Sequence, residues 1–164
     1  MPYPLKEVDI FYNLSDEHLE KILATCTEVK LVEGTVIFDE NTPGDEMYIV
    51  VRGSVEIQVD PGMLGLETSA GPTTIATLRK GQTFGEVVLV DRGLRSASAK
   101  VAQNNTTLLI IKRDDLIALC EQDYELGYLL MRNIAADLSF KIRGTDLMVR
   151  EQLLWRPSEL QEED

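Results

Sequence analysis

The stretch from Phe84 to Val101 reads FGEVVLVDRGLRSASAKV. In it Gly85 permits a tight turn, and the residues up to Val90 are long enough for about one helical turn whose exposed amides would face an anion. Arg95 offers a planar fork of donors that suits two phosphate oxygens, and Glu86 can accept hydrogen bonds from a sugar hydroxyl. The stretch therefore predicts a pocket for one phosphate and one sugar. The alternative is that Glu86 and Arg95 only form a salt bridge in a β-rich domain.

The composition indicates one soluble, acidic domain. The chain has 164 residues, enough for one domain of ordinary size with its own core. Its formal net charge of −12 argues against binding of nucleic acid by the chain itself, because phosphate contacts depend on clustered Lys and Arg. No apolar run approaches the roughly 18 residues of a membrane span, and the N-terminus MPYPLKEVDI lacks the core of a signal peptide. We therefore expect a cytoplasmic protein with no membrane partner.

The order of the elements predicts a mostly β fold with flanking helices. Residues 9 to 27 have the apolar spacing of one amphipathic helix, with Ser15 as its N-cap and His18 at the capping-box position. Between residues 29 and 111, short β runs separated by Gly, Asn and Asp predict a double-sheet jelly-roll barrel. The predicted strands are Val29 to Leu31, Val36 to Asp39, Glu46 to Arg52, Ser54 to Val59, Thr74 to Arg79, Ser96 to Val101 and Thr107 to Ile111.

Two helices are predicted after the barrel, within a single domain that spans residues 1 to 154. Arg113 to Glu121 forms the first, and Asp123 to Leu154 forms a longer one with a weak point at Gly144. The longer helix carries an a/d seam, which either packs on the chain's own barrel or, after Lys141, pairs with a second copy. The seam consists of Ala135, Leu138, Ile142, Thr145, Val149 and Gln152.

Two further segments lack helical or strand periodicity. Asp60 to Thr73 contains three Gly and two Pro, which predicts a mobile hairpin loop, either a partner contact or a tolerated surface insertion. Residues 155 to 164 form a short acidic tail, and Pro157 stops the preceding helix. Trp155 either packs locally or stacks on a base or a partner.

The cysteines and the single histidine give no support for catalysis or for a metal site. Cys26 and Cys120 stand alone in helical contexts, which predicts buried thiols over a disulfide bridge. His18 is the only histidine and is expected to be solvated on a surface helix. A metal-dependent jelly-roll enzyme needs several His and carboxylate ligands, and no Ser/His or Cys/His pair stands at a plausible site. We expect no catalytic residue, no metal ligand and no cofactor.

The chain resembles the cyclic nucleotide-binding domains of the catabolite activator protein and of the regulatory subunits of cAMP-dependent protein kinase. The resemblance rests on Phe84-Gly85-Glu86, Leu89 and Arg95-Ser96-Ala97, with the Glu-to-Arg spacing of that family's phosphate-binding cassette. It covers roughly residues 9 to 150. Further matches upstream are Gly34-Thr35-Val36-Ile37-Phe38, Glu40, Gly44-Asp45-Glu46-Met47-Tyr48-Ile49-Val50, Gly53 and Val55.

The resemblance implies a ligand and its contacts. Glu86 would hold the ribose 2′-hydroxyl and Arg95 the cyclic phosphate, and Ser96 with nearby backbone amides would complete the phosphate cradle. Val88 departs from the family, where Ala or Gly is usual, and its branched side chain narrows the approach to the phosphate. The predicted ligand-binding residues are Phe84, Gly85, Glu86, Val87, Val88, Arg95, Ser96 and Ala97.

The same resemblance implies how the ligand acts. The C-terminal helix of the family crosses the pocket mouth, so Lys141, Ile142 and Thr145 would form a lid over the base. The usual adenine contacts are not plainly reproduced, and cAMP is favoured over cGMP on family grounds. Only ten residues follow Leu154, which leaves no room for the helix-turn-helix domain of related transcription factors, so direct gene regulation is not expected.

The implied function is a regulatory module whose C-terminal helices shift on ligand binding and control a separate effector protein. Leu89, beneath the cassette, either transmits the shift or is plain core. A homodimer through the C-terminal helix is a further expectation. The alternative is a degenerate scaffold domain that kept the fold and lost the ligand.

Overall fold

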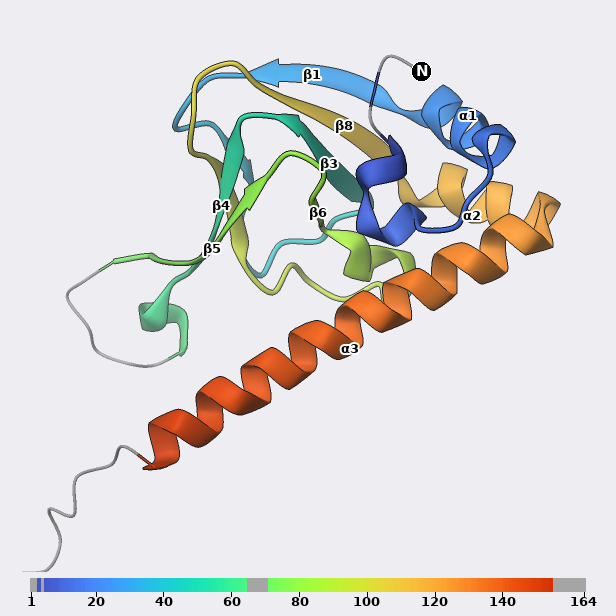
Figure 1. The fold of residues 1–164 in the computed structure, drawn as a ribbon. Helices are drawn as coiled ribbons and strands as arrows, with labels where there is room; N and C mark the ends of the chain where they lie inside the picture. Colours follow the sequence, from blue (N-terminus) through green and yellow to red (C-terminus); the bar gives the residue numbers. More distant parts are fainter. Residues whose placement is uncertain (1–2, 4, 65–70, 155–164) are drawn as a thin grey trace, which may run out of the picture.

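The chain folds into two facing antiparallel sheets with helices packed against one of them (Figure 1). The computed structural model describes residues 3, 5–64 and 71–154. The first sheet has the strand order β1-β8-β3-β6 and the second the order β2-β7-β4-β5, which confirms the predicted double-sheet jelly roll as a sandwich of two sheets that do not close into a barrel in the described part of the chain. The strands are β1 (Thr27–Leu31), β2 (Val36–Phe38), β3 (Glu46–Arg52), β4 (Ser54–Val59), β5 (Thr73–Arg79), β6 (Thr83–Phe84), β7 (Ser98–Val101) and β8 (Thr106–Lys112).

Strand β3 lies at the centre of the fold because both of its faces are covered. Its sequence EMYIVVR is an almost continuous apolar run, which is typical of a strand buried on both sides. Tyr48 and Val50 belong to the core between the two sheets, together with Phe84 of β6. Met47 and Ile49 belong to a second core between the first sheet and the helices. The alternating side chains of one strand thus join both cores.

The N-terminal segment is not the single helix expected over residues 9 to 27. Two 3-10 turns, η1 (Leu5–Glu7) and η2 (Asp9–Phe11), precede α1 (Asp16–Thr25). Asn13 has a φ of 66° and breaks the helical path between them. Ser15 then starts α1, because its side chain accepts a hydrogen bond from the backbone N–H of His18.

The prediction that His18 is solvated is wrong. Its side chain completes the capping box with the Ser15 backbone, but the residue is only 7% exposed. Its Nε2 atom lies 3.4 Å from Asp123 Oδ2, at the junction between the two C-terminal helices. His18 therefore caps α1 and is at the same time covered by residues far away in the sequence, such as Asp123.

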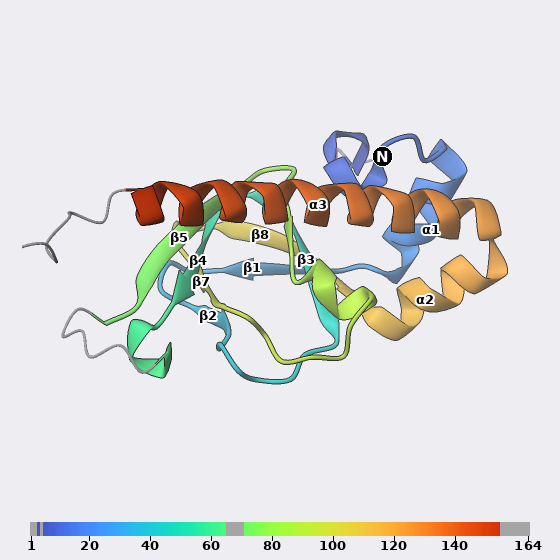
Figure 2. The ribbon, with the colours of Figure 1, turned by 90° about the horizontal axis from the view of Figure 1, so that it is seen from below.

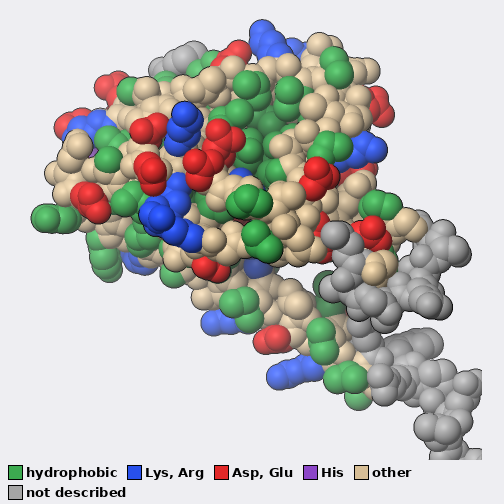
Figure 3. Space-filling model, turned by 180° about the vertical axis from the view of Figure 1, so that it is seen from behind, with side chains coloured by type: hydrophobic (Ala, Val, Ile, Leu, Met, Phe, Trp, Pro, Cys, Tyr) green, Lys and Arg blue, Asp and Glu red, His purple; other side chains and the backbone are tan. Residues whose placement is uncertain are grey.

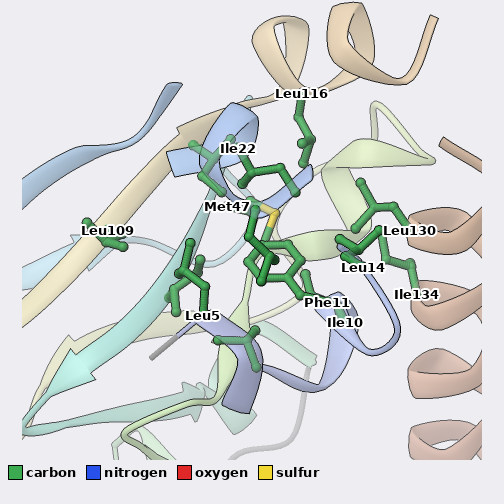
Figure 4. Packing of buried hydrophobic residues seen from close by; sticks show 14 of the residues in the cluster. Leu5, Ile10, Phe11, Leu14, Ile22, Met47, Leu109, Leu116, Leu130 and Ile134 are labelled. Carbon is green, nitrogen blue, oxygen red and sulfur yellow. The ribbon is translucent and has the colours of Figure 1, made fainter. Parts of the chain in front are cut away.

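Helices α2 (Arg113–Gln122) and α3 (Tyr124–Leu154) complete the helical layer. Figure 4 shows side chains of α2 and α3 meeting those of the N-terminal turns, α1, β3 and β8 in one core. The Asn133 side chain ties α3 to the N-terminal segment, because its Nδ2 donates to the carbonyl oxygens of Ile10 at 3.0 Å and Tyr12 at 2.7 Å. The packed part of α3 extends past Asn133 to Leu138, which packs against the same core.

In Figure 1 the second half of α3 runs away from the sandwich, and Figure 2 shows α3 as one straight helix along the length of the molecule. From Ser139 onward, every side chain of α3 that the structure describes is exposed. The helix continues through Gly144, where a break was expected, and a Cβ built there would meet nothing within 4 Å. Figure 3 shows this part of the helix standing clear of the body, with hydrophobic side chains among charged ones.

The remaining strand and loop predictions agree with the structure within two residues at most. The bounds of β3 and β4 are as predicted, β7 begins at Ser98 instead of Ser96, and the two-residue β6 was missed. The predicted hairpin loop joins the antiparallel β4 and β5 and contains a 3-10 turn, η3 (Pro61–Leu64). Residues 65–70, Trp155 and the acidic tail lie outside the described residues.

The cysteines are free thiols in the structure. Cys26 and Cys120 are both half-buried. Burial raises the pKa of the Cys26 thiol to about 12 and also raises the pKa of Cys120, so both thiols stay protonated at neutral pH. Within the described ranges, no group of His, Cys, Asp and Glu is arranged to hold a metal ion, and no helix has the length and apolar character of a membrane span.

Candidate functional site

The backbone of Arg95 is fixed between two loops. Its N–H donates to the Thr42 carbonyl oxygen at 2.8 Å, and its own carbonyl accepts from the Asn41 N–H at 2.8 Å. A β-bridge between Pro43 and Leu94 holds the same two loops together. Arg95 therefore lies in a loop outside the regular strands, but both its N–H and its carbonyl are hydrogen-bonded to the neighbouring loop.

The guanidinium of Arg95 is buried against glycine backbones and an aromatic ring. The residue is 6% exposed, its Nη2 donates to the Glu46 carbonyl oxygen at 2.8 Å, and its Cζ lies 4.2 Å from the centroid of the Phe38 ring. A Cβ at Gly44 would lie 2.2 Å from Arg95 Nε, and one at Gly85 would lie 2.8 Å from Nη1. Both positions need glycine because the guanidinium occupies the space that a side chain at either position would fill.

Glu86 opens η4 (Glu86–Leu89), the one helical turn predicted between Gly85 and Val90. Gly85 has a φ of 75°, a left-handed conformation that glycine adopts without strain. Glu86 is 4% exposed, and its Oε1 accepts a hydrogen bond from Lys141 Nζ of α3. The buried carboxylate of Glu86 thus has its counter-ion on α3, at Lys141, 55 residues later in the sequence.

Lys141 is held by two carboxylates at once. Besides Glu86, it pairs with Asp137 Oδ2 at 2.8 Å, one turn earlier on the helix. Burial alone would lower the pKa of Lys141, but the hydrogen bonds with Asp137 and Glu86 raise it above its usual value. The ammonium is therefore charged at any physiological pH.

Three buried polar atoms of Arg95 and Glu86 have no hydrogen-bond partner among the described residues. They are two donors, Arg95 Nε and Nη1, and one acceptor, Glu86 Oε2. The structure gives no ion pair between Glu86 and Arg95 in the described part of the chain, so the salt-bridge alternative is not observed. An unpaired buried polar group costs roughly 1–3 kcal/mol, which an anionic acceptor facing Arg95 and a hydroxyl facing Glu86 would recover.

The other predicted contact residues lie on β6, η4 and the loop before β7. Phe84 is buried and stacks on Tyr48, with ring centroids 4.9 Å apart, so it supports the site from the core between the sheets. Val87 is exposed, whereas Val88 is buried and its N–H donates to the Gly85 carbonyl at 3.4 Å. Exposed Ser96 and half-buried Ala97 follow the buried Arg95.

The profile of the cyclic nucleotide-binding domain matches residues 28–123, a range that includes Glu86 and Arg95. The chain belongs to this family. The matched family is a ligand-binding domain and not a catalytic one. Its match begins in β1 and ends just after α2, so it covers both sheets and η4 but not α3.

Known relatives agree with this assignment. The chain is similar to the Cyclic AMP receptor protein of Thermus thermophilus, with 32% identity over 145 residues that cover 87% of this chain and 61% of the relative. It is similar to cGMP-dependent protein kinase 2 of Homo sapiens, with 32% identity over 111 residues that cover 67% of this chain and 14% of the kinase. The crystal structure of the Thermus thermophilus Catabolite Activator Protein superposes with a TM-score of 0.73 at 31% identity, over 88% of this chain and 62% of that chain. This chain therefore spans less than two thirds of each of these proteins.

Of the three residues predicted to form a lid over the base, Lys141 contacts the candidate site, through its ion pair with Glu86. Ile142 is exposed, and Thr145, also exposed, donates its hydroxyl to the Lys141 carbonyl at 3.0 Å. Sequence reasoning missed Asp137 and the Glu46 carbonyl as partners of the site. The spacing of Asp137 and Lys141, four residues apart on one helix, was the available signal.

A separate hollow of about 470 Å³ lies on the second sheet of the cyclic nucleotide-binding domain. Residues of β2, β4 and β7 line it, and its charged residues are Asp39, Glu40, Asp60 and Lys100, three acidic against one basic. It contains neither Glu86 nor Arg95, and its acidic lining disfavours an anionic ligand. The hollow is therefore separate from the candidate site around Arg95 and Glu86.

Proposed function

We propose that the protein is a regulatory module that binds a cyclic mononucleotide through Arg95 and Glu86. The unpaired atoms of the site, two buried donors on Arg95 and one buried acceptor on Glu86, support this proposal. A 3′,5′-cyclic nucleotide carries one anionic phosphodiester and keeps its 2′-hydroxyl, so it offers an acceptor group and a donor that match them. A linear nucleoside monophosphate brings additional phosphate charge that a buried site would have to desolvate.

Among cyclic nucleotides, we propose that cAMP is favoured over cGMP. The Thermus thermophilus relative, whose name refers to cyclic AMP, matches 87% of this chain, whereas the human kinase named for cGMP matches 67%. Ser96 carries a hydroxyl that can both donate and accept, so it does not select one base. The preference rests on the relatives and not on a base contact.

Ligand binding is proposed to act on a separate effector protein through the C-terminal helices. Leu89 of η4 is buried in the same core as Leu116 of α2, and η4 contacts α2. The pair between Glu86 and Lys141 connects η4 to α3. A ligand at η4 can shift these helices only by its differential affinity for their two positions. The net charge of −12 favours a protein partner over nucleic acid, and the cytoplasm is the proposed location.

A calorimetric titration tests the proposed ligand. We expect cAMP to bind the purified protein, cGMP to bind more weakly, and 5′-AMP to bind at least about tenfold more weakly than cAMP because of its additional phosphate charge. The same order should appear in the rise of the melting temperature, because a ligand that binds only the folded state stabilises it. Absence of a signal with both cyclic nucleotides would instead support the scaffold alternative.

The projecting part of α3 is proposed to form a homodimer. Hydrophobic side chains are exposed along it and leave the predicted seam uncovered by the described residues of the chain. Ile142, Val149 and Leu153 are exposed on the seam side of the helix, whereas exposed Phe140, Leu147 and Leu154 lie on the opposite side. Burying such a stripe against a second copy would remove apolar surface from water at roughly 25 cal/mol per Å².

A charge within the seam is expected to separate the two copies. Light scattering of the wild type should give about twice the chain mass of 18.4 kDa, and Val149→Glu should give a single chain mass at the same concentration. Leu147→Glu is the matched control, because Leu147 lies on the opposite side of the helix from the seam. A monomeric wild type would contradict the proposed dimer. Equal loss of the dimer in both variants would contradict the seam as its interface.

A further inference from the structure

The two carboxylate oxygens of Glu86 have different surroundings. Oε1 is paired with the ammonium of Lys141, and Asp137 holds the same ammonium from the preceding turn of α3. Oε2 is buried and has no hydrogen-bond partner among the described residues. One oxygen is therefore engaged by α3, and the other is available to a donor from outside the chain.

We propose that Lys141 is a positioning residue that stays on Oε1 when the nucleotide binds, so that α3 and the ribose hydroxyl share the carboxylate of Glu86. This inference rests on the proposed function, because it requires a nucleotide whose 2′-hydroxyl reaches Oε2. It replaces the sequence-based expectation that Lys141 covers the base. It also makes the coupling between ligand binding and the docking of α3 positive, because each then stabilises the other.

The burial of Glu86 favours a carboxylate shared by Lys141 and the ribose hydroxyl over an arrangement in which the hydroxyl displaces Lys141. The Glu86 side chain is 5% exposed, whereas the Lys141 side chain is 49% exposed. A neutral hydroxyl that displaced the ammonium would supply a hydrogen bond but leave a buried negative charge without its counter-ion, which is strongly unfavourable. A hydroxyl that binds Oε2 adds a hydrogen bond and leaves the ion pair in place.

Lys141 would also lower the cost of binding by fixing the carboxylate in advance. A carboxylate held at one oxygen by an ammonium, which is itself held by Asp137, has little freedom left to lose when a ligand arrives. The linkage is reciprocal, so a nucleotide that binds better when Lys141 is in place must also hold α3 more firmly against η4.

A thermodynamic cycle tests whether Lys141 acts through the ribose hydroxyl. Calorimetry on the full chain would give the affinities of the wild type and of Lys141→Met for cAMP and for 2′-deoxy-cAMP. We expect the variant to bind cAMP about tenfold more weakly, the effect of roughly one hydrogen bond to a charged group. With 2′-deoxy-cAMP, the wild type and the variant should differ by less than about twofold, because the shared contact is absent from both.

Two further variants complete the cycle. Lys141→Arg keeps the positive charge and should retain most of the affinity for cAMP. Arg143→Met removes the same charge from an exposed neighbouring position of α3 and should bind cAMP like the wild type. Melting curves of the unliganded variants would verify that each is folded, and Lys141→Gln offers a second neutral replacement if Lys141→Met is not.

The outcomes separate the inference from the proposed function. Equal or tighter binding of cAMP by Lys141→Met would overturn the inference, because Lys141 would then compete with the ribose. An equal loss of affinity for both nucleotides would also overturn it, because Lys141 would then act independently of the hydroxyl. A wild type that binds no cyclic nucleotide would instead overturn the proposed function, and the inference with it.

Discussion

Replacing Arg95 with Gln is expected to reduce the affinity for cAMP at least about 100-fold, because two charge-assisted hydrogen bonds to the phosphate would be lost. The free energy of unfolding of the unliganded variant should stay within about 1 kcal/mol of the wild type. Among the described residues, the Arg95 guanidinium donates one hydrogen bond, to the Glu46 carbonyl, and lies over the Phe38 ring, but it also buries two donors without partners. The gains and losses on removing it therefore largely offset each other.

Calorimetry and urea denaturation would measure the two effects of the Arg95 replacement separately. Arg95→Lys is the control, because it keeps the charge but loses the planar fork, and it should bind with an intermediate affinity. If Arg95→Gln bound cAMP as tightly as the wild type, the phosphate would have to lie elsewhere. If the variant failed to fold, the guanidinium would be a structural support and not a ligand-binding group.

Replacing Gly53 with Ala is expected to destabilise the fold by about 3 kcal/mol or more. Gly53 forms the turn between β3 and β4 with a φ of 82°, and a Cβ there would lie 2.2 Å from Thr106 Oγ1 and 2.8 Å from Thr106 Cα. Thr106 is fully buried, and its hydroxyl donates to the Gln103 carbonyl at 2.7 Å. Because the clash includes a backbone atom, rotating the Thr106 side chain cannot relieve it.

Gly34→Ala is the matched control for this turn. Gly34 has a φ of 88°, so its replacement carries similar backbone strain, but a Cβ there would meet nothing within 4 Å. We expect a loss of about 1–2 kcal/mol from the strain alone. Urea denaturation of both variants would isolate the cost of the clash with Thr106, and equal losses would contradict it.

The β-sandwich could be predicted from the sequence because apolar runs and turn glycines mark most of its strands locally. The run from Glu46 to Arg52 is apolar almost throughout, and Gly53 separates it from the next strand, so both strands have the predicted bounds. The two-residue β6 carries too little periodicity to be found in this way. The N-terminal helix was placed too early because apolar spacing continues across Asn13, where the backbone turns left-handed.

The chemistry of the site was only partly predictable from the sequence. The burial of Glu86 and Arg95 agrees with a binding role, whose individual contacts stay predictions. Their protein partners were not foreseen, because the pairing of Glu86 with Lys141 and of Arg95 with the Glu46 carbonyl depends on how distant elements pack. His18 was misjudged for the same reason, since α1 packs against α2 and His18 meets Asp123 at the junction between α2 and α3.

The amide of Asn133 gives α3 the mechanics of a lever. Its two hydrogen bonds to Ile10 and Tyr12 fix a pivot on the helix, and the described side chains of the last turns up to Leu154 are exposed. With a rise of about 1.5 Å per residue, the arm from Asn133 to Leu154 is about 30 Å long. A tilt of about 10° at the pivot would therefore move the far end by about 5 Å. The same tilt would move Lys141, about 12 Å from the pivot, by about 2 Å, so a shift beside Glu86 is enlarged about 2.5-fold at the far end of the helix.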